Sequence, residues 1–463
     1  MTRLTRSTRS RGTRHGVLAT ALAGLLLALP GCAGFGNFGN DPGVTTVTFA
    51  SVNNPQMQDL AQLIVEFERE HPDIRINTLM MEENDLRNAV TKDVATEGGQ
   101  YDVMTVGLYE VPIWGQNKWL VDLTDLARED PSYDVDDIFT PVLDGVSYQD
   151  RYYAMPFYGE SSFLAYRADL FEEAGLEMPE RPTWDDVREL AAELNAPQDD
   201  FSGICLRGLA GWGEVMAPMT TAINTFGGGW FDEDWNATLD SPETREAVET
   251  YIDTVQQYGQ PGAATSGFGD CLTRFAQGQA AMWYDATSMV STVEDPASST
   301  VAGKVGYAPA PVADTGSAGW LYSWSLAIPS TSEHKDAAWD FVSWMTDKDY
   351  LRLVGEEIGW ERVPPGSRLS TYEIPEYAEV SQAYADATLD SMNGATQESA
   401  MTHPVPYPGI QFVGIPEFQD LGTRVGQQMS AAIAGQVSID EAVAQSQRYA
   451  DTVAETYRAQ EEQ

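Results

Sequence analysis

The fold of this chain is decided by residues 44–106, which begin VTTVTFASVNNPQMQDLAQLIVEF over positions 44–67. The segment from Val44 to Ala50 alternates apolar residues with threonine, which is typical of a half-buried β-strand. Behind Pro55, apolar residues recur at helical spacing, namely Met57, Leu60, Ile64 and Phe67. The start of this stretch therefore predicts a strand followed by an amphipathic helix.

The same order of strand and helix repeats further along the stretch. A break at His71-Pro72-Asp73 is followed by a predicted strand over residues 74–81, a helix, and a third strand over residues 101–106. The helix is marked by apolar residues at helical spacing, which are Leu86, Val90 and Val94. Such alternation implies a parallel sheet with helices on both faces, in which ligands bind beyond the carboxyl ends of the strands.

The rest of the chain carries the elements of a second α/β lobe. A chain of 463 residues, 43% of them hydrophobic, is too long for one ordinary core, so we expect two lobes. Thr183 stands where a helix over residues 184–194 needs its N-cap. Further helical patterns cover residues 167–174, 242–258, 334–345, 418–434 and 439–458, and an apolar strand covers residues 321–329.

Charge and aromatic content exclude two classes of protein. The formal net charge of −43 leaves no basic surface able to displace counterions from phosphates, which excludes a nucleic-acid-binding protein. The 12 Trp, 20 Tyr and 16 Phe residues exclude a disordered chain, because aromatic surface at this density must be buried or must contact something. The acidity itself is typical of solubility in an extracellular medium and identifies no ligand.

The N-terminal region reads as an export signal followed by a tether. Residues 1–32 are predicted to be a lipoprotein signal peptide, because a basic front precedes an apolar run from Val17 to Leu29 that is too short to span a bilayer comfortably. Leu29-Pro30-Gly31-Cys32 resembles a lipobox, and Cys32 would carry the lipid; an ordinary signal peptide with an incidental cysteine is the alternative. The Gly- and Asn-rich residues 33–43 are expected to form a flexible tether. Lipid alone would anchor the protein, because no later run of about 18 apolar residues exists.

The cysteines and histidines give no support to a metal site, a cofactor or Cys-His catalysis. Cys205 and Cys271 either pair in an oxidising compartment or remain two buried thiols, because sequence does not show whether their Cα atoms approach within bridging distance. No CxxC or CxxH spacing occurs, and His71, His334 and His403 are widely scattered. We therefore expect neither metal nor cofactor.

Several segments in one order carry a resemblance to a known family. They are EENDLR (82–87), GGQYDVMTVGLYEVPIWG (98–115), PFYGESS (156–162), GICLRGLAGWGE (203–214), MWYDAT (282–287), WLYSWSLAIP (320–329) and PYPGIQFVGIPEFQ (406–419). These segments resemble extracellular solute-binding protein family 1 of ABC transporters, which includes maltose-binding protein, and within it the sorbitol/mannitol-binding (polyol-binding) lipoproteins. The resemblance runs from about Val44 to the C-terminal helices.

The resemblance implies an α/β, two-lobed periplasmic-binding-protein fold of type II, with a parallel-rich sheet flanked by helices in each lobe and hinge strands between them. It places lobe 1 at residues 44–157 and 325–370, and lobe 2 at residues 158–324 and 371–463. The ligand would bind in the cleft and draw the lobes together, and the importer would recognise the closed form.

A polyol ligand sets clear demands on such a cleft. It carries a hydroxyl on every carbon, and an unmatched buried hydroxyl costs roughly 1 to 3 kcal/mol, so the site needs dense carboxylate, amide and guanidinium groups. By alignment on the family motif, the resemblance assigns ligand contacts to Tyr109, Glu110 and Glu160. The remaining candidates are Asn53, Asn54, Glu83, Ser161, Arg207, Trp212, Asp285, Trp320, Trp324, Gln411 and Phe412.

Structural roles compete with ligand contact at these positions. Tyr109 can pack the lobe, Asn54 is equally a turn signal before Pro55, and the residues after Glu83 can cap a helix. Arg207 can form a buried ion pair with Asp285 or Glu160 without touching a ligand. Tryptophans beside a hinge strand, here Trp320 and Trp324, are more often part of the core.

The function that follows is capture of a sugar alcohol such as mannitol, sorbitol or arabitol, and its delivery to the transmembrane subunits of an ABC permease. We expect a monomer that is lipid-anchored at the extracellular face of the cell membrane and is not an enzyme. A mono- or oligosaccharide is the alternative ligand. An extracellular glycosidase is the alternative activity, since it too would be acidic and rich in aromatic residues. An adhesive lipoprotein would show repeats or low-complexity stalks, and neither occurs.

Overall fold

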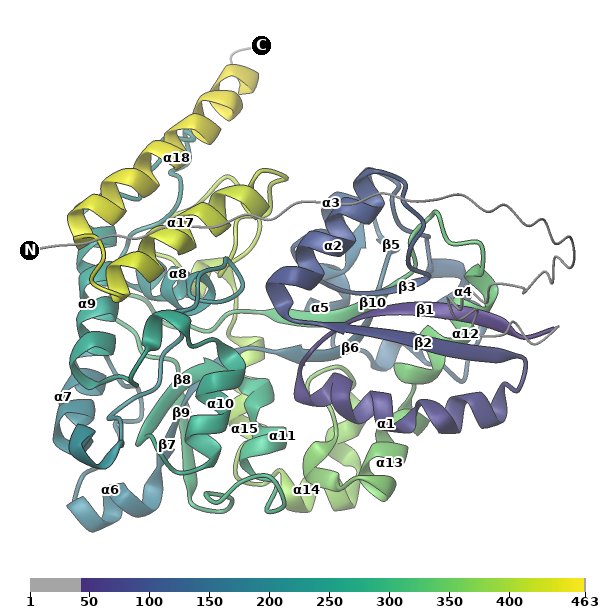
Figure 1. Ribbon diagram of the computed structural model, residues 1–463, viewed down its shortest axis with the longest axis horizontal. Helices are drawn as coiled ribbons and strands as arrows, with labels where there is room; N and C mark the ends of the chain where they lie inside the picture. Colours follow the sequence, from purple (N-terminus) through teal and green to yellow (C-terminus); the bar gives the residue numbers. More distant parts are fainter. Residues whose placement is uncertain (1–42, 462–463) are drawn as a thin grey trace, which may run out of the picture. The chain divides into compact units, whose positions relative to one another are not determined.

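The computed structural model describes residues 43–461, and residues 44 onward form one compact unit (Figure 1). The predicted signal peptide, the tether up to residue 42 and Cys32 lie outside the described residues. Within the described part, no helix combines the length and apolar character that crossing a bilayer requires.

A five-stranded sheet forms the first lobe, with strand order β2-β1-β3-β10-β6. Its strands are β1 (Thr45–Val52), β2 (Ile74–Met81), β3 (Val103–Gly107), β6 (Met155–Glu160) and β10 (Tyr322–Ala327). The first three pair in parallel, with Thr45 opposite Ile74 and Phe49 opposite Val103, as the strand and helix alternation predicts. Strand β10 runs antiparallel to both β3 and β6, so the sheet is mixed.

The helices of this lobe follow from the spacing of their apolar residues. Helix α1 (Pro55–Glu70) begins at Asn54, whose side chain accepts a hydrogen bond from the Met57 amide at 3.0 Å. It buries the predicted Met57, Leu60 and Phe67 together with Leu63, while Ile64 is half-buried. Helix α2 (Glu83–Ala95) buries Leu86, Val90 and Val94, as predicted. Helices α2 and α3 lie over one face of the sheet, and α1 and α12 lie over the other (Figure 1).

A three-stranded sheet forms the core of the second lobe. Strand β7 (Ser162–Arg167) lies between β8 (Met282–Ala286) and β9 (Val305–Pro309), and both neighbours run antiparallel to it. The expected two-lobed α/β architecture is present, but the expectation of a parallel-rich sheet is wrong for this lobe. The partners of β7 come from distant parts of the chain and are not joined to it by strand-helix-strand crossovers. In the described part of this lobe, parallel pairing is limited to isolated bridges that join Thr183 to Val312, Ser202 to Ala280 and Cys205 to Trp283.

The remaining elements surround these two sheets, and the predicted helices are present with small shifts at their ends. In the first lobe they include α3 (Glu110–Gln116), α4 (Thr124–Glu129), α5 (Thr140–Gly145), β4 (Ser147–Tyr148), β5 (Arg151–Tyr152), α12 (Lys335–Met345), α13 (Lys348–Glu357) and α14 (Pro375–Val380). Around the second sheet they are α6 (Ala168–Ala174), α7 (Trp184–Leu194), α8 (Met216–Thr225), α9 (Pro242–Tyr258), α10 (Phe268–Ala276), α11 (Val290–Val293), α15 (Ala385–Asn393), α16 (Gln397–Ala400), α17 (Phe418–Ile433) and α18 (Ile439–Glu461). Short 3-10 helices are η1 (Val135–Asp137), η2 (Pro197–Asp199), η3 (Ala263–Thr265), η4 (Thr287–Met289), η5 (Trp360–Arg362) and η6 (Leu369–Glu373).

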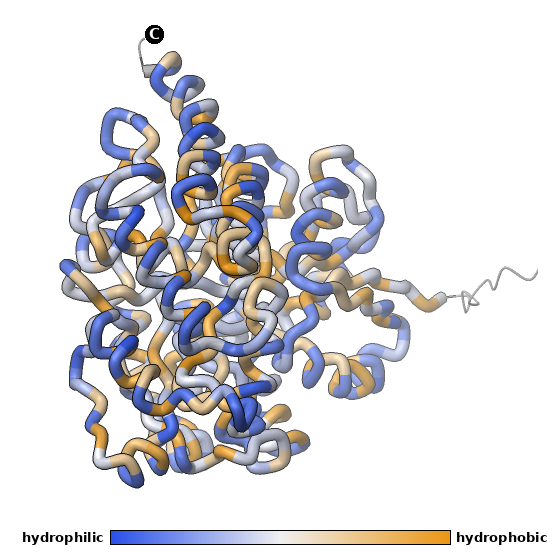
Figure 2. The backbone as a smooth tube through the Cα atoms, turned by 60° about the vertical axis from the view of Figure 1, so that its left-hand side comes forward, coloured by the Kyte–Doolittle hydropathy of each residue, from blue (hydrophilic) through white to orange (hydrophobic). Residues whose placement is uncertain are grey.

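Hydrophilic and hydrophobic residues are interspersed along the described chain (Figure 2). Helix α7 shows why one of the helices starts where it does. The Thr183 side chain caps it by accepting from the Asp186 amide, and Asp186 accepts in return from the Thr183 amide. This is the N-cap that the sequence predicts.

The chain passes between the two sheets at two places, which lie close to the expected lobe boundaries at residues 157/158 and 324/325. It leaves β6 at Glu160, enters β7 at Ser162, and returns into the first sheet through β10 at Tyr322. After the expected boundary at residues 370/371, α14 packs against η5 and η6, whereas α15 packs against β7 and β9. The exact lobe boundaries stay a prediction.

Cys205 and Cys271 are joined by a disulfide, with their Cα atoms 5.6 Å apart. The bond ties the extended segment beside β8 to helix α10, and both residues are fully buried. Of the two possibilities that the sequence leaves open, the structure therefore has the paired one.

Candidate ligand-binding site

A cavity of about 410 Å³ lies where the two lobes meet. Its volume falls in the range of small-molecule sites. The first lobe contributes the carboxyl end of β1 and the starts of α1 and α2, and the second lobe contributes residues 207–217 and 267–273. The polar and aromatic lining includes Asn53, Asn54, Gln58, Glu82, Glu83, Arg87, Tyr158, Glu160, Arg207, Trp212, Glu214, Phe268, Asp270, Thr273, Ser288, Trp320, Tyr322, Trp324 and Gln411.

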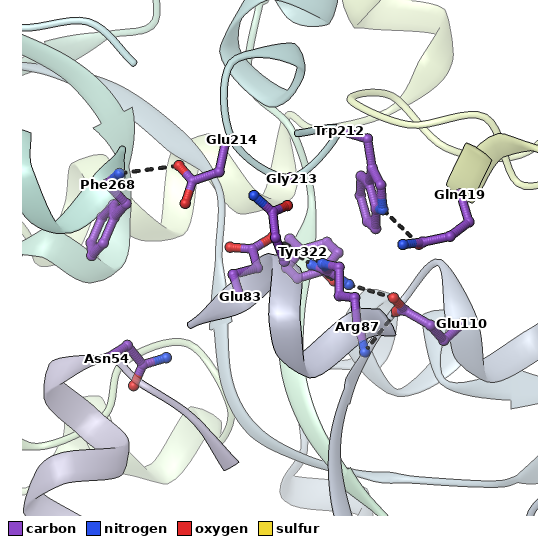
Figure 3. Close-up of polar contacts among 12 residues, drawn as sticks. Asn54, Glu83, Arg87, Glu110, Trp212, Gly213, Glu214, Phe268, Tyr322 and Gln419 are labelled. Carbon is purple, nitrogen blue, oxygen red and sulfur yellow. Dashed lines mark hydrogen bonds and ion pairs between the residues drawn. The ribbon is translucent and has the colours of Figure 1, made fainter. Parts of the chain in front are cut away.

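Arg87 is fixed on the first-lobe side of the cavity. Its Nε donates to Glu83 at 2.9 Å, Nη2 donates to the Tyr322 hydroxyl at 2.7 Å, and Nη1 pairs with Glu110 (Figure 3). The guanidinium lies 4.1 Å from the ring centre of Trp212 and 4.6 Å from that of Trp324. Burial disfavours its charge, but Glu110, Tyr322 and Glu83 together more than compensate, so the pKa of Arg87 is raised well above its usual value.

Arg207 is fixed in the same manner on the second-lobe side. Its Nε and Nη2 bind both carboxylate oxygens of Asp285, and Nη1 donates to the Gly213 carbonyl at 2.7 Å. The ring centre of Phe268 lies 5.1 Å from the guanidinium carbon. Asp285 has no exposed surface and Arg207 is 5% exposed, so this is a buried ion pair.

Two further carboxylates line the cavity without such a bidentate partner. Glu160 accepts a hydrogen bond from the Ser288 hydroxyl at 2.5 Å, and burial raises its pKa to about 7 although that bond and the charge of Arg207 lower it. Glu214 accepts from the Phe268 amide at 3.2 Å and lies 3.7 Å from Nη1 of Arg207 (Figure 3). Burial also raises the pKa of Glu214. Both groups therefore combine strong acceptor capacity with a tendency to hold a proton.

Contacts between the lobes surround the cavity. Asn84 Nδ2 donates to the Ala210 carbonyl at 3.0 Å, and Gln56 Nε2 donates to the Ser291 hydroxyl at 2.8 Å. Arg362 Nη1 donates to the Thr292 hydroxyl at 3.4 Å. These bonds hold side chains of both lobes around one enclosed space.

The structure brings most of the predicted site residues into the cavity lining. Those that line it are Asn53, Asn54, Glu83, Glu160, Arg207, Trp212, Trp320, Trp324 and Gln411. Asn54 also has the structural role that competed for it, because it caps α1 while its Nδ2 donates to the Tyr158 hydroxyl at 3.0 Å.

The other predicted residues lie behind the lining. Glu110 pairs with Arg87. Asp285 pairs with Arg207, which is the buried ion pair that we considered as the alternative to ligand contact. The Tyr109 hydroxyl accepts from the Gln419 amide at 3.0 Å and donates to the Ile415 carbonyl at 3.1 Å. Ser161 donates to the Ser391 carbonyl at 3.1 Å, and the Phe412 ring packs on Tyr109. Four of these residues contact side chains of the lining: Glu110 contacts Arg87, Asp285 contacts Arg207, and Tyr109 and Phe412 both contact Trp212.

Sequence reasoning missed several residues of the lining, chiefly Arg87, Tyr158, Glu214, Ser288 and Tyr322. Four of them lie inside the segments that carry the family resemblance, so the signal was present. Arg87 could also have been found from spacing, because it follows Glu83 by four residues and therefore shares a helix face with it.

Two α/β lobes joined by extended segments, with a polar cavity lined from both, define a solute-binding protein. Residues 52–351 match the family of bacterial extracellular solute-binding proteins, and the chain belongs to that family. It binds a solute and is not an enzyme, as expected.

Relatives and solved structures agree with this assignment. The chain is 45% identical over 433 residues to the mannitol-binding protein of Pseudomonas aeruginosa, covering 93% of this chain and 96% of that protein. An ABC transporter solute-binding protein of Agrobacterium vitis with bound D-mannitol has a TM-score of 0.87 and 46% identity, over 89% of this chain and 99% of that one. A solute-binding protein of Agrobacterium radiobacter in complex with ribitol has a TM-score of 0.77 and 27% identity, over 89% and 99%.

Proposed function

We propose that this protein captures an acyclic polyol of the mannitol type in the cavity and delivers it to an ABC permease. The observation that carries the proposal is the lining itself: carboxylates, amides and hydroxyls from both lobes surround a cavity of about 410 Å³. An acyclic polyol needs such a partner for nearly every carbon. The mannitol- and ribitol-binding relatives support the same ligand class.

Each group in the lining has a chemical role in this proposal. Glu83, Glu160 and Glu214 accept hydrogen bonds from ligand hydroxyls, because an ionised oxygen accepts strongly from adjacent donors. Asn53 and Gln411 offer amides that can donate and accept. Trp320 offers an apolar face to the C–H edges of the ligand.

The arrangement of the tryptophans favours an acyclic ligand over a ring sugar. A ring sugar stacks flat on exposed aromatic faces, but Arg87 covers one face of Trp212 and one face of Trp324. Hydrogen-bonding groups therefore dominate the lining. The alternative of a mono- or oligosaccharide ligand predicts tighter binding of maltose or glucose than of mannitol.

A ligand panel tests the proposal directly. Isothermal titration calorimetry with mannitol, sorbitol, arabitol and ribitol, against maltose and glucose, should show binding of one or more polyols and no heat from the ring sugars. A protein that binds maltose or glucose more tightly than every polyol would overturn the assignment.

We further propose that lipid on Cys32 anchors the protein, as a monomer, at the extracellular face of the membrane. The lipobox-like Leu29–Cys32 supports this proposal. Expression of the full chain with Cys32→Ser should move the protein from the membrane fraction to the medium. Mass spectrometry of the mature N-terminal peptide should find a diacylglyceryl group, and an unmodified residue 32 would refute the anchor.

A further inference from the structure

Negative charge exceeds positive charge around the cavity. The carboxylates that line it are Glu82, Glu83, Glu160, Glu214 and Asp270, and those of Glu110 and Asp285 lie behind the lining. Arg87 and Arg207 are the basic side chains in the lining that the structure describes.

Each guanidinium is already paired with protein carboxylates, Arg87 with Glu83 and Glu110, and Arg207 with Asp285 and, at 3.7 Å, Glu214. Every nitrogen of Arg87 donates to a protein oxygen, those of Glu83, Glu110 and Tyr322, and the aromatic rings of Trp212 and Trp324 cover the group. The same holds for Arg207, whose nitrogens bind Asp285 and the Gly213 carbonyl. A ligand carboxylate or phosphate would therefore meet, in the described lining, only arginines whose charge protein carboxylates already balance.

Two buried carboxylates of the lining, Glu160 and Glu214, remain without comparable neutralisation. The hydrogen bond of Glu160 comes from a neutral hydroxyl, and that of Glu214 comes from a neutral backbone amide. The charged groups that face Glu160 and Glu214 are Arg207, Asp285 and Glu83, and two of these three repel a negative charge. An ammonium group placed beside these carboxylates would be attracted, whereas an anion would be repelled.

Resting on the polyol-binding function proposed above, we propose that the cavity selects its ligand by charge. It excludes acyclic polyols that bear a carboxylate or a phosphate, and it accepts polyols that bear a protonated amine as well as neutral ones. Glu160 and Glu214 are the residues that determine this specificity. An organic cation is the fitting occupant, because among the described residues no group of three or more His, Cys, Asp or Glu is placed to hold a metal ion.

A matched ligand series isolates the charge. Mannitol, 1-amino-1-deoxymannitol and mannonate share their stereochemistry and differ at one terminal carbon, so their affinities can be compared by calorimetry at pH 8. We expect the amine to bind at least as tightly as mannitol, and mannonate to bind at least about 100-fold more weakly. At pH 6 the gap between mannitol and mannonate should narrow, because protonation removes negative charge from the cavity. Mannonate binding as tightly as mannitol at pH 8 would overturn the proposal.

Two variants and a control locate the effect. Glu214→Gln and Glu160→Gln keep an acceptor oxygen but remove the charge, and each should weaken binding of the amine relative to mannitol by about 10-fold. Glu189→Gln, at an exposed position on α7, should leave all the ratios unchanged. If both cavity variants kept the amine-to-mannitol affinity ratio of the unmodified protein, the roles assigned to Glu160 and Glu214 in charge selection would be refuted. If a variant fails to fold, the affinities of the unmodified protein for mannitol and mannonate at pH 6 and pH 8 still test the proposal. Absence of binding by every neutral polyol, in contrast, would count against the proposed function itself.

Discussion

Replacing Asp285 by asparagine would remove the charge that holds Arg207 inside the protein. The Asp285 carboxylate accepts from Arg207 Nε at 2.8 Å and from Nη2, and also from Trp283 Nε1 at 3.1 Å and from the Ala286 amide at 2.7 Å. An amide offers one acceptor oxygen where the carboxylate offers two, and its NH2 group would face donors. Because Asp285 is fully buried, we expect Asp285→Asn to lower the free energy of unfolding by about 3 to 5 kcal/mol.

The assay is equilibrium unfolding in guanidinium chloride, with the slope checked for constancy. Asp169→Asn is the matched control, because Asp169 also pairs with an arginine through both oxygens but its side chain is 38% exposed. That control should cost no more than about 1 kcal/mol. The double variant Arg207→Met/Asp285→Leu should recover much of the loss, since no uncompensated buried charge remains. Equal losses in Asp285→Asn and Asp169→Asn would refute the reasoning.

Three further predictions concern the disulfide, the ligand and pH. Cys205→Ser/Cys271→Ser should lower the free energy of unfolding by roughly 4 kcal/mol for a bond that closes a loop of 66 residues, and an unchanged denaturation midpoint would contradict this. A polyol at about 100-fold over its Kd should raise stability by about 2.7 kcal/mol in thermal or chemical denaturation, and Glu160→Ala should abolish most of that gain; full retention would remove Glu160 from the site. Because burial raises the pKa of Glu160 from 4.5 to about 7, the folded state binds its proton more tightly than the unfolded state, so stability should fall as pH rises through that window. The loss should total about 3 kcal/mol, and Glu160→Gln should show a correspondingly flatter profile in ligand-free unfolding between pH 4.5 and 7.5.

The first lobe could be predicted from sequence because its signals are local. Alternating threonines in β1 and the apolar spacing of Met57, Leu60 and Phe67 are each contained in one element, and strict alternation of single strands with single helices favours parallel pairing. The second sheet could not be predicted in this way. Strand β7 pairs with residues 282–286 and 305–309, far along the chain, and no local pattern encodes such a pairing. The disulfide could not be predicted from local sequence either, because residues 205 and 271 come together only in the folded protein.

The candidate site was predictable to the extent that it follows from topology. Asn53 and Glu83 come after β1 and β2, and the carboxyl ends of parallel strands are where a ligand is expected. Sequence could not separate the lining from the residues behind it. Glu110 and Asp285 are acidic residues in family motifs, yet each faces an arginine rather than the cavity. Each arginine has two carboxylates near it, and one of them faces the cavity while the other does not. Only the three-dimensional structure shows which one does.

The two buried arginine pairs are better explained by the shape of the site than by stability. Apolar residues of similar volume often replace a buried ion pair at no cost, so stability alone does not account for Arg87 with Glu110 or Arg207 with Asp285. In each pair the arginine and the carboxylate bind each other at the side of the cavity. The rings of Trp212 and Trp324 pack on Arg87, and the ring of Phe268 packs on Arg207. Apolar replacements would strand the Tyr322 hydroxyl and the Gly213 carbonyl that the guanidiniums now bind. Variants with such replacements should therefore stay folded but lose affinity for a polyol, because the positions of Glu83 and Glu214 would no longer be fixed from behind.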